Sequence, residues 1–166
     1  ERAIAEIAER LAASTRAESI RDVRGTVVQI PDPDAVTGAL ILPSYEEVST
    51  DKRSFAESFR IQYRNTDPFT GKPLLERSGD QWLLQNPPAI PLSRGELDTV
   101  YELPYTRSFH PMYSTAGGVP AAEEVSFSLT SSRGCFGECS FCSLTFHQGR
   151  IVQGGGAIRS YGRQKP

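Results

Sequence analysis

The sequence has 166 residues, of which 38% are hydrophobic and 23% are charged, enough for one modest globular domain. The formal net charge of -2 gives no reason to expect a nucleic acid or an anionic membrane as the main partner. No apolar run approaches the roughly 20 residues of a membrane span, and no basic-then-apolar leader is present, so we expect a cytoplasmic protein. Because the first residue is Glu1 rather than a methionine, we expect a fragment of a longer protein.

The first thirty residues predict a helix followed by a short strand. The helix is expected to end near Ala13, because apolar residues recur at helical spacing among Glu and Arg at Ile4, Ile7, Ala8 and Leu11. The β-branched residues between 27 and 30 favour a strand. Pro31 and Pro33 lack backbone donors and should end it.

A longer helical segment is expected from about 44 to 64. Ser44 and Glu47 can form a capping box, and Asp51 offers a second helix start. The segment carries an aromatic ladder at helical spacing, which we expect to lie in the core, at Phe55, Phe59 and Tyr63.

Apolar residues at 74–75 and 82–84 flank the sequence Ser78-Gly79-Asp80, which predicts a β-hairpin. Trp82, at strand spacing in the second arm, is expected to belong to the core. Asp67-Pro68 and Gly71-Lys72-Pro73 break the preceding helix before the hairpin begins.

The region after the hairpin predicts one further helix, a connector and a strand. Ser93 and Glu96 can form a second capping box before an apolar face that includes Leu97. Residues 105–122 show no clear period and are expected to form a surface connector. Residues 125–130 should form a strand, because apolar and polar side chains alternate there, with the apolar ones at Val125, Phe127 and Leu129.

Three cysteines lie within eight residues in a CxxxCxxC arrangement, at Cys135, Cys139 and Cys142. Because none is left to join distant parts of the chain, they indicate a ligand cluster in a reducing compartment rather than disulfides. Gly134 and Gly137 permit the tight turns with which one loop can surround an iron-sulfur cluster. Three thiolates on a cluster of four irons would leave one iron open.

Two other interpretations of the cysteines remain open. The three thiols and His147 could form a tetrahedral zinc shell in a non-catalytic binding module. Cys139 and Cys142 could instead form a redox pair, although this leaves Cys135 without a role.

Two histidines and two arginines are not expected to be catalytic. His110 and His147 are interpreted as hydrogen-bonded structural residues. Arg133 and Arg150 flank the loop and could offset the negative charge of thiolates, but an exposed arginine needs no such role. No side chain is assigned as catalytic.

The cysteine run resembles the loop of a known family. Residues 132–142, followed by 145–150, resemble the corresponding segment of the YgiQ family of radical S-adenosylmethionine (radical SAM) proteins. The resemblance covers roughly residues 1–153, and segments upstream of the loop share it, namely Leu42 to Val48, Asn86 to Ala89, Leu103 to Tyr105, and His110-Pro111.

The resemblance implies an α/β fold class, with connecting helices and strands that lead into a partial (β/α) barrel. It implies that residues 1–13 are the closing helix of an amino-terminal Rossmann-like domain and that 14–122 form a family-specific connecting region. It places the start of the radical SAM core at 123–153, with its first strand at 125–130. Residues 154–166 form an atypical tail that does not resemble the family.

The resemblance also implies an enzyme with two cofactors. Cys135, Cys139 and Cys142 would bind a [4Fe-4S] cluster whose open iron takes S-adenosyl-L-methionine, and Phe141 would lie against the adenine. Reductive cleavage of this small molecule would start a radical reaction on a substrate that the sequence does not identify. Neither the electron donor, the oligomeric state nor a use of cobalamin follows from the sequence. Because the later barrel strands are absent, the fragment alone is expected to be inactive.

Overall fold

The computed structural model describes residues 2–106, 108–126, 128, 132–137, 139 and 141–154. The fold is mixed α/β, which confirms the expected fold class. Within these described residues, short 3-10 helices occur at Ala17–Ser19, Pro33–Ala35 and Pro111–Ala116. The helices and strands are, in chain order, α1 (Arg2–Ala12), β1 (Val27–Ile30), β2 (Leu40–Ile41), α2 (Tyr45–Thr50), α3 (Lys52–Arg64), β3 (Leu74–Ser78), β4 (Gln81–Gln85), α4 (Arg94–Tyr101), α5 (Pro120–Val125), β5 (Ser132–Arg133), α6 (Leu144–Gln148) and β6 (Gln153–Gly154).

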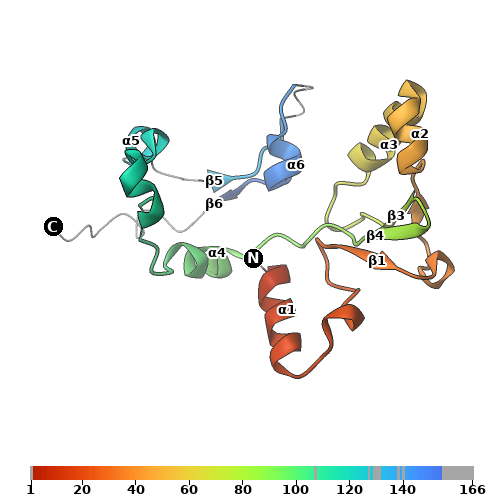
Figure 1. Ribbon diagram of the computed structural model, residues 1–166, viewed down its shortest axis with the longest axis horizontal. Helices are drawn as coiled ribbons and strands as arrows, with labels where there is room; N and C mark the ends of the chain where they lie inside the picture. The colour runs from red at the N-terminus through yellow and green to blue at the C-terminus, as the bar shows by residue number, and fades with distance from the viewer. Residues whose placement is uncertain are drawn as a thin grey trace.

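The larger sheet has the strand order β1-β4-β3-β2. The predicted hairpin is confirmed: β3 and β4 pair antiparallel, and Gly79 makes the turn with a φ of 58°. The predicted strand β1 pairs antiparallel with β4, and β2 pairs parallel with β3. Figure 1 shows α2 and α3 on one side of this sheet and α1 on the other.

The core of this sheet is small and lies on one of its faces. Ile30, Leu75 and Leu84 are buried together there, and the ring of Trp82 is partly buried against them. Leu74, in the hairpin, is also buried, at 2% exposure. The expectation that Trp82 contributes to the core is therefore confirmed.

The predicted helical segment at 44–64 divides into α2 and α3 at Asp51. Ser44 and Glu47 form the predicted capping box. Asp51 adopts an extended backbone and caps α3 by accepting a hydrogen bond from the Ser54 N–H at 2.9 Å. The expected core positions of Phe55 and Phe59 are wrong, because their side chains remain 58% and 50% exposed.

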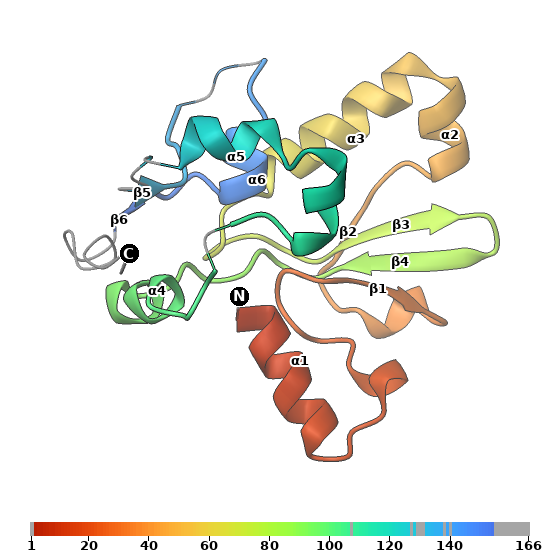
Figure 2. The ribbon, with the colours of Figure 1, turned by 60° about the vertical axis from the view of Figure 1, so that its left-hand side comes forward.

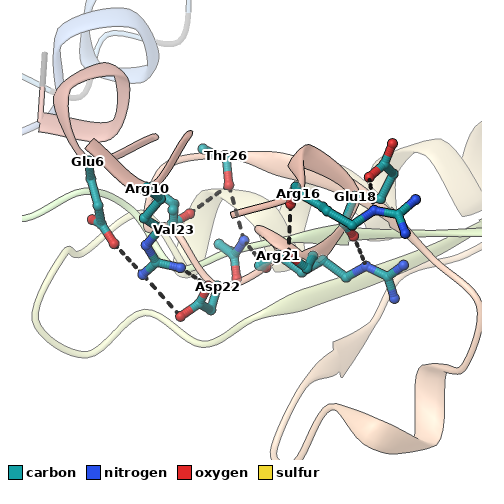
Figure 3. Close-up of polar contacts among 10 residues, drawn as sticks. Glu6, Arg10, Arg16, Glu18, Arg21, Asp22, Val23 and Thr26 are labelled. Atoms are coloured by element: carbon teal, nitrogen blue, oxygen red, sulfur yellow. Dashed lines mark hydrogen bonds and ion pairs between the residues drawn. The ribbon is translucent and has the colours of Figure 1, made fainter. Parts of the chain in front are cut away.

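The N-terminal helix α1 is confirmed, but its apolar stripe lies largely at the surface. Ile4 is 76% exposed, and no residue of α1 is buried. Exposed polar contacts link the helix to the segment that follows it. Figure 3 shows the Arg10 guanidinium between the carboxylates of Glu6 and Asp22, with Nη2 of Arg10 3.2 Å from Asp22 Oδ2.

Within the described chain, no helix is long and apolar enough to span a membrane.

The segment after β4 is fixed by a buried amide. Asn86 is 7% exposed, and its Nδ2 donates to the carbonyl oxygen of Arg21 at 2.9 Å and to Thr26 Oγ1 at 3.1 Å. The N–H of Gly25 donates to the carbonyl oxygen of Pro87 at 2.9 Å. The motif at 86–88 is thereby held against residues 21–26 before the chain enters α4, whose predicted capping box is confirmed.

The region after α4 differs from expectation in two respects. The described residues of 105–122 are largely exposed, as expected of a surface connector, but they include the 3-10 helix Pro111–Ala116 and the start of α5. The strand expected at 125–130 does not start at Val125, which is the last residue of α5. Pro120 presets the first turn, and Ala and Glu residues follow it, so helix propensity prevails over the alternating pattern. Residues 127 and 129–131, like the tail from 155 on, lie outside the described residues.

Candidate functional site

The three cysteines lie on a loop whose two ends are joined by a small ladder. Strands β5 and β6 pair antiparallel, with Ser132 opposite Gly154 and Arg133 opposite Gln153. Above this ladder, the Cys135 N–H donates to the carbonyl oxygen of Gly149 at 3.0 Å. The segment 134–152 is therefore a closed loop, which we call the cysteine loop; its described part includes all three cysteines.

The base of the cysteine loop requires glycine at one position. Gly134 has a φ of 83°, in the left-handed region that side chains rarely adopt. A Cβ atom there would lie 2.2 Å from the carbonyl oxygen of Ile151, which belongs to the returning arm of the loop. Its N–H donates to Oε1 of Gln148 at 3.1 Å. The close approach of the two arms thus depends on the missing side chain, which confirms the tight turn predicted at this glycine.

Gly137 lies beside two of the three sulfur atoms. A Cβ atom on Gly137 would be 3.3 Å from the sulfur of Cys135 and 3.9 Å from that of Cys139. The Gly137 N–H also donates to the Cys135 sulfur at 3.4 Å. Hydrogen bonds to the sulfurs are one of the features that tune iron-sulfur clusters. Two of the three sulfurs therefore lie beside the same backbone turn.

The thiols are chemically available. All three cysteines are free of disulfides; Cys139 is exposed, while Cys135 and Cys142 are half-buried. The Cys142 N–H donates to the carbonyl oxygen of Cys139 at 3.1 Å, so these two residues bound one tight turn. Free thiols on a short glycine-containing loop are the donor set that iron-sulfur clusters use, so the residues present fit such a group.

A shell for a single zinc ion is not assembled. Among the described residues, no three His, Cys, Asp or Glu side chains are gathered closely enough to hold a metal ion, so the three cysteines are not preassembled as ligands of zinc or of a cluster. Ligands of one zinc lie within roughly 4 Å of each other, because each Zn–S bond is only about 2.3 Å long. His147, the fourth ligand of that alternative, is an exposed residue of α6.

Phe141, the residue expected to contact a nucleoside, is open to solvent. Its side chain is 90% exposed, and it directly precedes Cys142. Phe136, on the other side of Gly137, is 82% exposed. Large aromatic rings exposed to this extent beside free thiols are available to a planar ligand. The role of Phe141 stays a prediction, as do those of the three cysteines.

The structure also places the remaining histidine and the two arginines for which the sequence suggested a role. His110 caps the 3-10 helix at Pro111–Ala116, and its Nδ1 accepts from the Met112 N–H at 3.2 Å, so its structural role is confirmed. Arg133 lies in β5. Arg150 lies over an aromatic ring, with its guanidinium carbon 4.2 Å from the centroid of Tyr63. Whether either arginine offsets thiolate charge stays untested.

A cleft of about 920 Å³ separates the cysteine loop from the sheet region. Sequence reasoning missed it because its walls come from distant segments whose polar residues carry no common motif. Two of its lining residues are joined by a hydrogen bond, which Gln153 Nε2 donates to the carbonyl oxygen of Leu92 at 2.7 Å. The walls include residues from β1, the end of α3, the segment after β4, and α6, among them Thr26, Gln62, Asn65, Asn86, Phe146 and Gln148.

Comparison with known families identifies the framework that carries this loop. A family model described as radical SAM N-terminal matches residues 1–128, most of the chain. The chain belongs to the radical SAM N-terminal family. The matched region of this radical SAM protein ends before the first cysteine at 135, so the match rests on the helices and strands that precede the loop.

Curated relatives extend the similarity. UPF0313 proteins from Clostridium botulinum (strain ATCC 19397 / Type A) and Clostridium perfringens (strain 13 / Type A) are each 48% identical over 153 residues, 92% of this chain. These matches confirm the predicted resemblance to YgiQ-like proteins. The chain spans only 24% and 23% of the two relatives. No solved structure matches the chain.

Proposed function

We propose that the chain provides the cluster-binding loop of a radical SAM enzyme, with Cys135, Cys139 and Cys142 as ligands of a [4Fe-4S] cluster. The observation that carries the proposal is the pair of sulfurs beside Gly137, on a closed loop of free cysteines, in a chain of the radical SAM N-terminal family. Three thiolates leave one iron for S-adenosyl-L-methionine. When bound and reduced, the cluster supplies the electron that cleaves this molecule and starts a radical reaction.

The residues of the chain would prepare the site in three ways. The Gly137 N–H donates to the Cys135 sulfur and so fixes the turn that presents this side chain. The close contact at Gly134 closes the base of the loop. Phe141, exposed next to the third cysteine, offers a flat apolar face on which an adenine can stack.

The substrate, the electron donor and other partners are proposed to bind elsewhere in the protein. The substrate of the radical, the electron donor and any other partner would be recognised by parts of the protein beyond the segment shared here, since the chain covers about a quarter of its relatives. We expect the isolated segment to bind the cluster without completing a reaction. The domain boundaries expected from the sequence stay predictions.

Metal content tests the proposal. The full-length gene product, purified without oxygen and supplied with iron and sulfide, should hold about four irons and four sulfides per chain. Cys139→Ala should lose the brown colour and most of the iron, while Ser143→Ala, an exposed neighbour without a side-chain capping bond, should keep both. One tightly bound zinc without acid-labile sulfide would instead support the zinc module and contradict the proposal.

A further inference from the structure

An aromatic cluster joins the cysteine loop to α3. Phe59 and Tyr63 lie on α3, Phe146 lies on α6, and Arg150 follows α6; we call these four residues the aromatic anchor. The ring centroids of Phe59 and Tyr63 are 5.7 Å apart, and the ring of Phe146 lies 5.9 Å from the first and 5.7 Å from the second. Figure 2 shows α6 beside the C-terminal half of α3.

Tyr63 is the residue on which these contacts converge. Its ring contacts Phe59 along α3 and Phe146 across to α6, and the Arg150 guanidinium carbon lies 4.2 Å from its centroid. Tilted rings at these separations attract through their quadrupoles, and a guanidinium over a ring face adds a cation–π attraction. Both ends of the segment 146–150 are therefore held on one side chain.

The segment held by Tyr63 contains the acceptors that position the first cysteine. The carbonyl oxygen of Gly149, next to Arg150, accepts from the Cys135 N–H at 3.0 Å. Gln148 Oε1 accepts from the Gly134 N–H at 3.1 Å. Any shift of this segment away from α3 would therefore move or break the bonds at the base of the cysteine loop.

We propose that Tyr63 is a positioning residue for the cysteine loop, acting through Arg150 and Phe146 on the backbone that holds Cys135. In this view the region before the loop serves as the platform that sets where the first sulfur is presented. The consequence for cluster binding rests on the function proposed above. The positioning itself is a property of the metal-free chain and can be measured without a cluster.

The test compares three variants in the full-length gene product. Tyr63→Leu removes the ring, Tyr63→Phe keeps it, and Phe55→Leu alters an exposed aromatic residue on the same helix outside the anchor. Amide exchange of Cys135 in the metal-free protein should rise about tenfold in Tyr63→Leu and stay unchanged in the other two. After reconstitution, Tyr63→Leu should also bind less iron and give an altered electron paramagnetic resonance spectrum.

The outcomes separate the two proposals. Unchanged Cys135 exchange, iron content and spectrum in Tyr63→Leu would overturn the positioning role, even if the wild type carries a cluster. A wild type without a cluster would overturn the proposed function, while the exchange measurement would still decide the positioning role. If Tyr63→Leu fails to fold, Arg150→Gln replaces it: a rise in Cys135 exchange supports the role, and wild-type exchange overturns it.

Discussion

The backbone of Gly134 approaches the carbonyl oxygen of Ile151 so closely that a Cβ atom on the glycine would lie 2.2 Å from it. Gly134→Ala should therefore push the two arms of the cysteine loop apart, besides straining a residue with a φ of 83°. We expect the variant to lose most of its iron on anaerobic reconstitution. Iron and acid-labile sulfide per chain are the measurements.

Gly149→Ala is the matched control for this substitution. Gly149 lies in the same loop with a φ of 85°, but a Cβ atom there would meet nothing within 4 Å. It lacks the clash but carries backbone strain of its own, because a φ of 85° with a ψ of 169° is open essentially to glycine alone; iron retained above the level of Gly134→Ala therefore measures the clash. Equal losses in both variants would show that strain alone, and not the close contact, governs the loop.

Asn86 should be one of the most sensitive polar residues before the loop. Asn86→Leu removes the buried amide that donates to the Arg21 carbonyl oxygen and to Thr26 Oγ1, and leaves these two part-buried acceptors without that donor. The free energy of unfolding in urea should fall by about 1–3 kcal/mol. Gln85→Ala, at an exposed neighbouring position, should change it by less than about 0.5 kcal/mol. A similar loss in both would contradict the role of the buried amide.

The location of the core can be tested with two apolar residues. Leu97 on α4 is 1% exposed, so Leu97→Ala should lower the free energy of unfolding by about 2–5 kcal/mol. Phe55 is 58% exposed, and Phe55→Ala should cost less than about 1 kcal/mol. Urea denaturation at neutral pH measures both. Should Phe55→Ala prove the costlier, the core assignment would be wrong.

The ion pair between α1 and α4 should make stability depend on acidic pH. The Arg2 guanidinium, which donates from Nε to Glu96 Oε1 at 3.0 Å, lowers the pKa of Glu96 to about 2, with help from Ser93. The ordinary pKa of a glutamate side chain is 4.5. The stabilisation by this ion pair is therefore complete above pH 4.5 and is lost as the pH falls toward 2.

Glu96→Gln removes this titration, so its urea midpoint should fall less steeply than that of the wild type between pH 5 and pH 2.5, the window set by these two values. Glu124→Gln, at an exposed position on α5, is the control and should follow the wild type. Parallel pH profiles for wild type and Glu96→Gln would refute the assignment.

Elements with signals confined to a few neighbouring residues were predictable from the sequence. The capping boxes at Ser44 and Ser93 begin helices where expected, because each satisfies backbone donors within one turn. The hairpin followed from apolar runs on either side of Gly79. The cysteine cluster was equally visible, since its spacing is local.

Features that depend on distant partners were not predictable. Strand β2 has two residues and exists because β3 pairs with it from more than thirty residues away. Phe59 has the spacing of a core residue. Besides Tyr63, however, its ring contacts Phe146, which is distant in the sequence. The charge of Arg150 is evident from the sequence, but no sequence pattern predicts its position over the ring of Tyr63.

The most direct test of the account is cleavage of S-adenosyl-L-methionine by the full-length gene product, reconstituted without oxygen and given a strong reductant. The account predicts methionine and 5'-deoxyadenosine in the wild type, and neither above background in Cys135→Ala, Cys139→Ala or Cys142→Ala. A wild type that carries its full iron and sulfide but leaves the molecule intact, or cleavage that survives the loss of these cysteines, would contradict it.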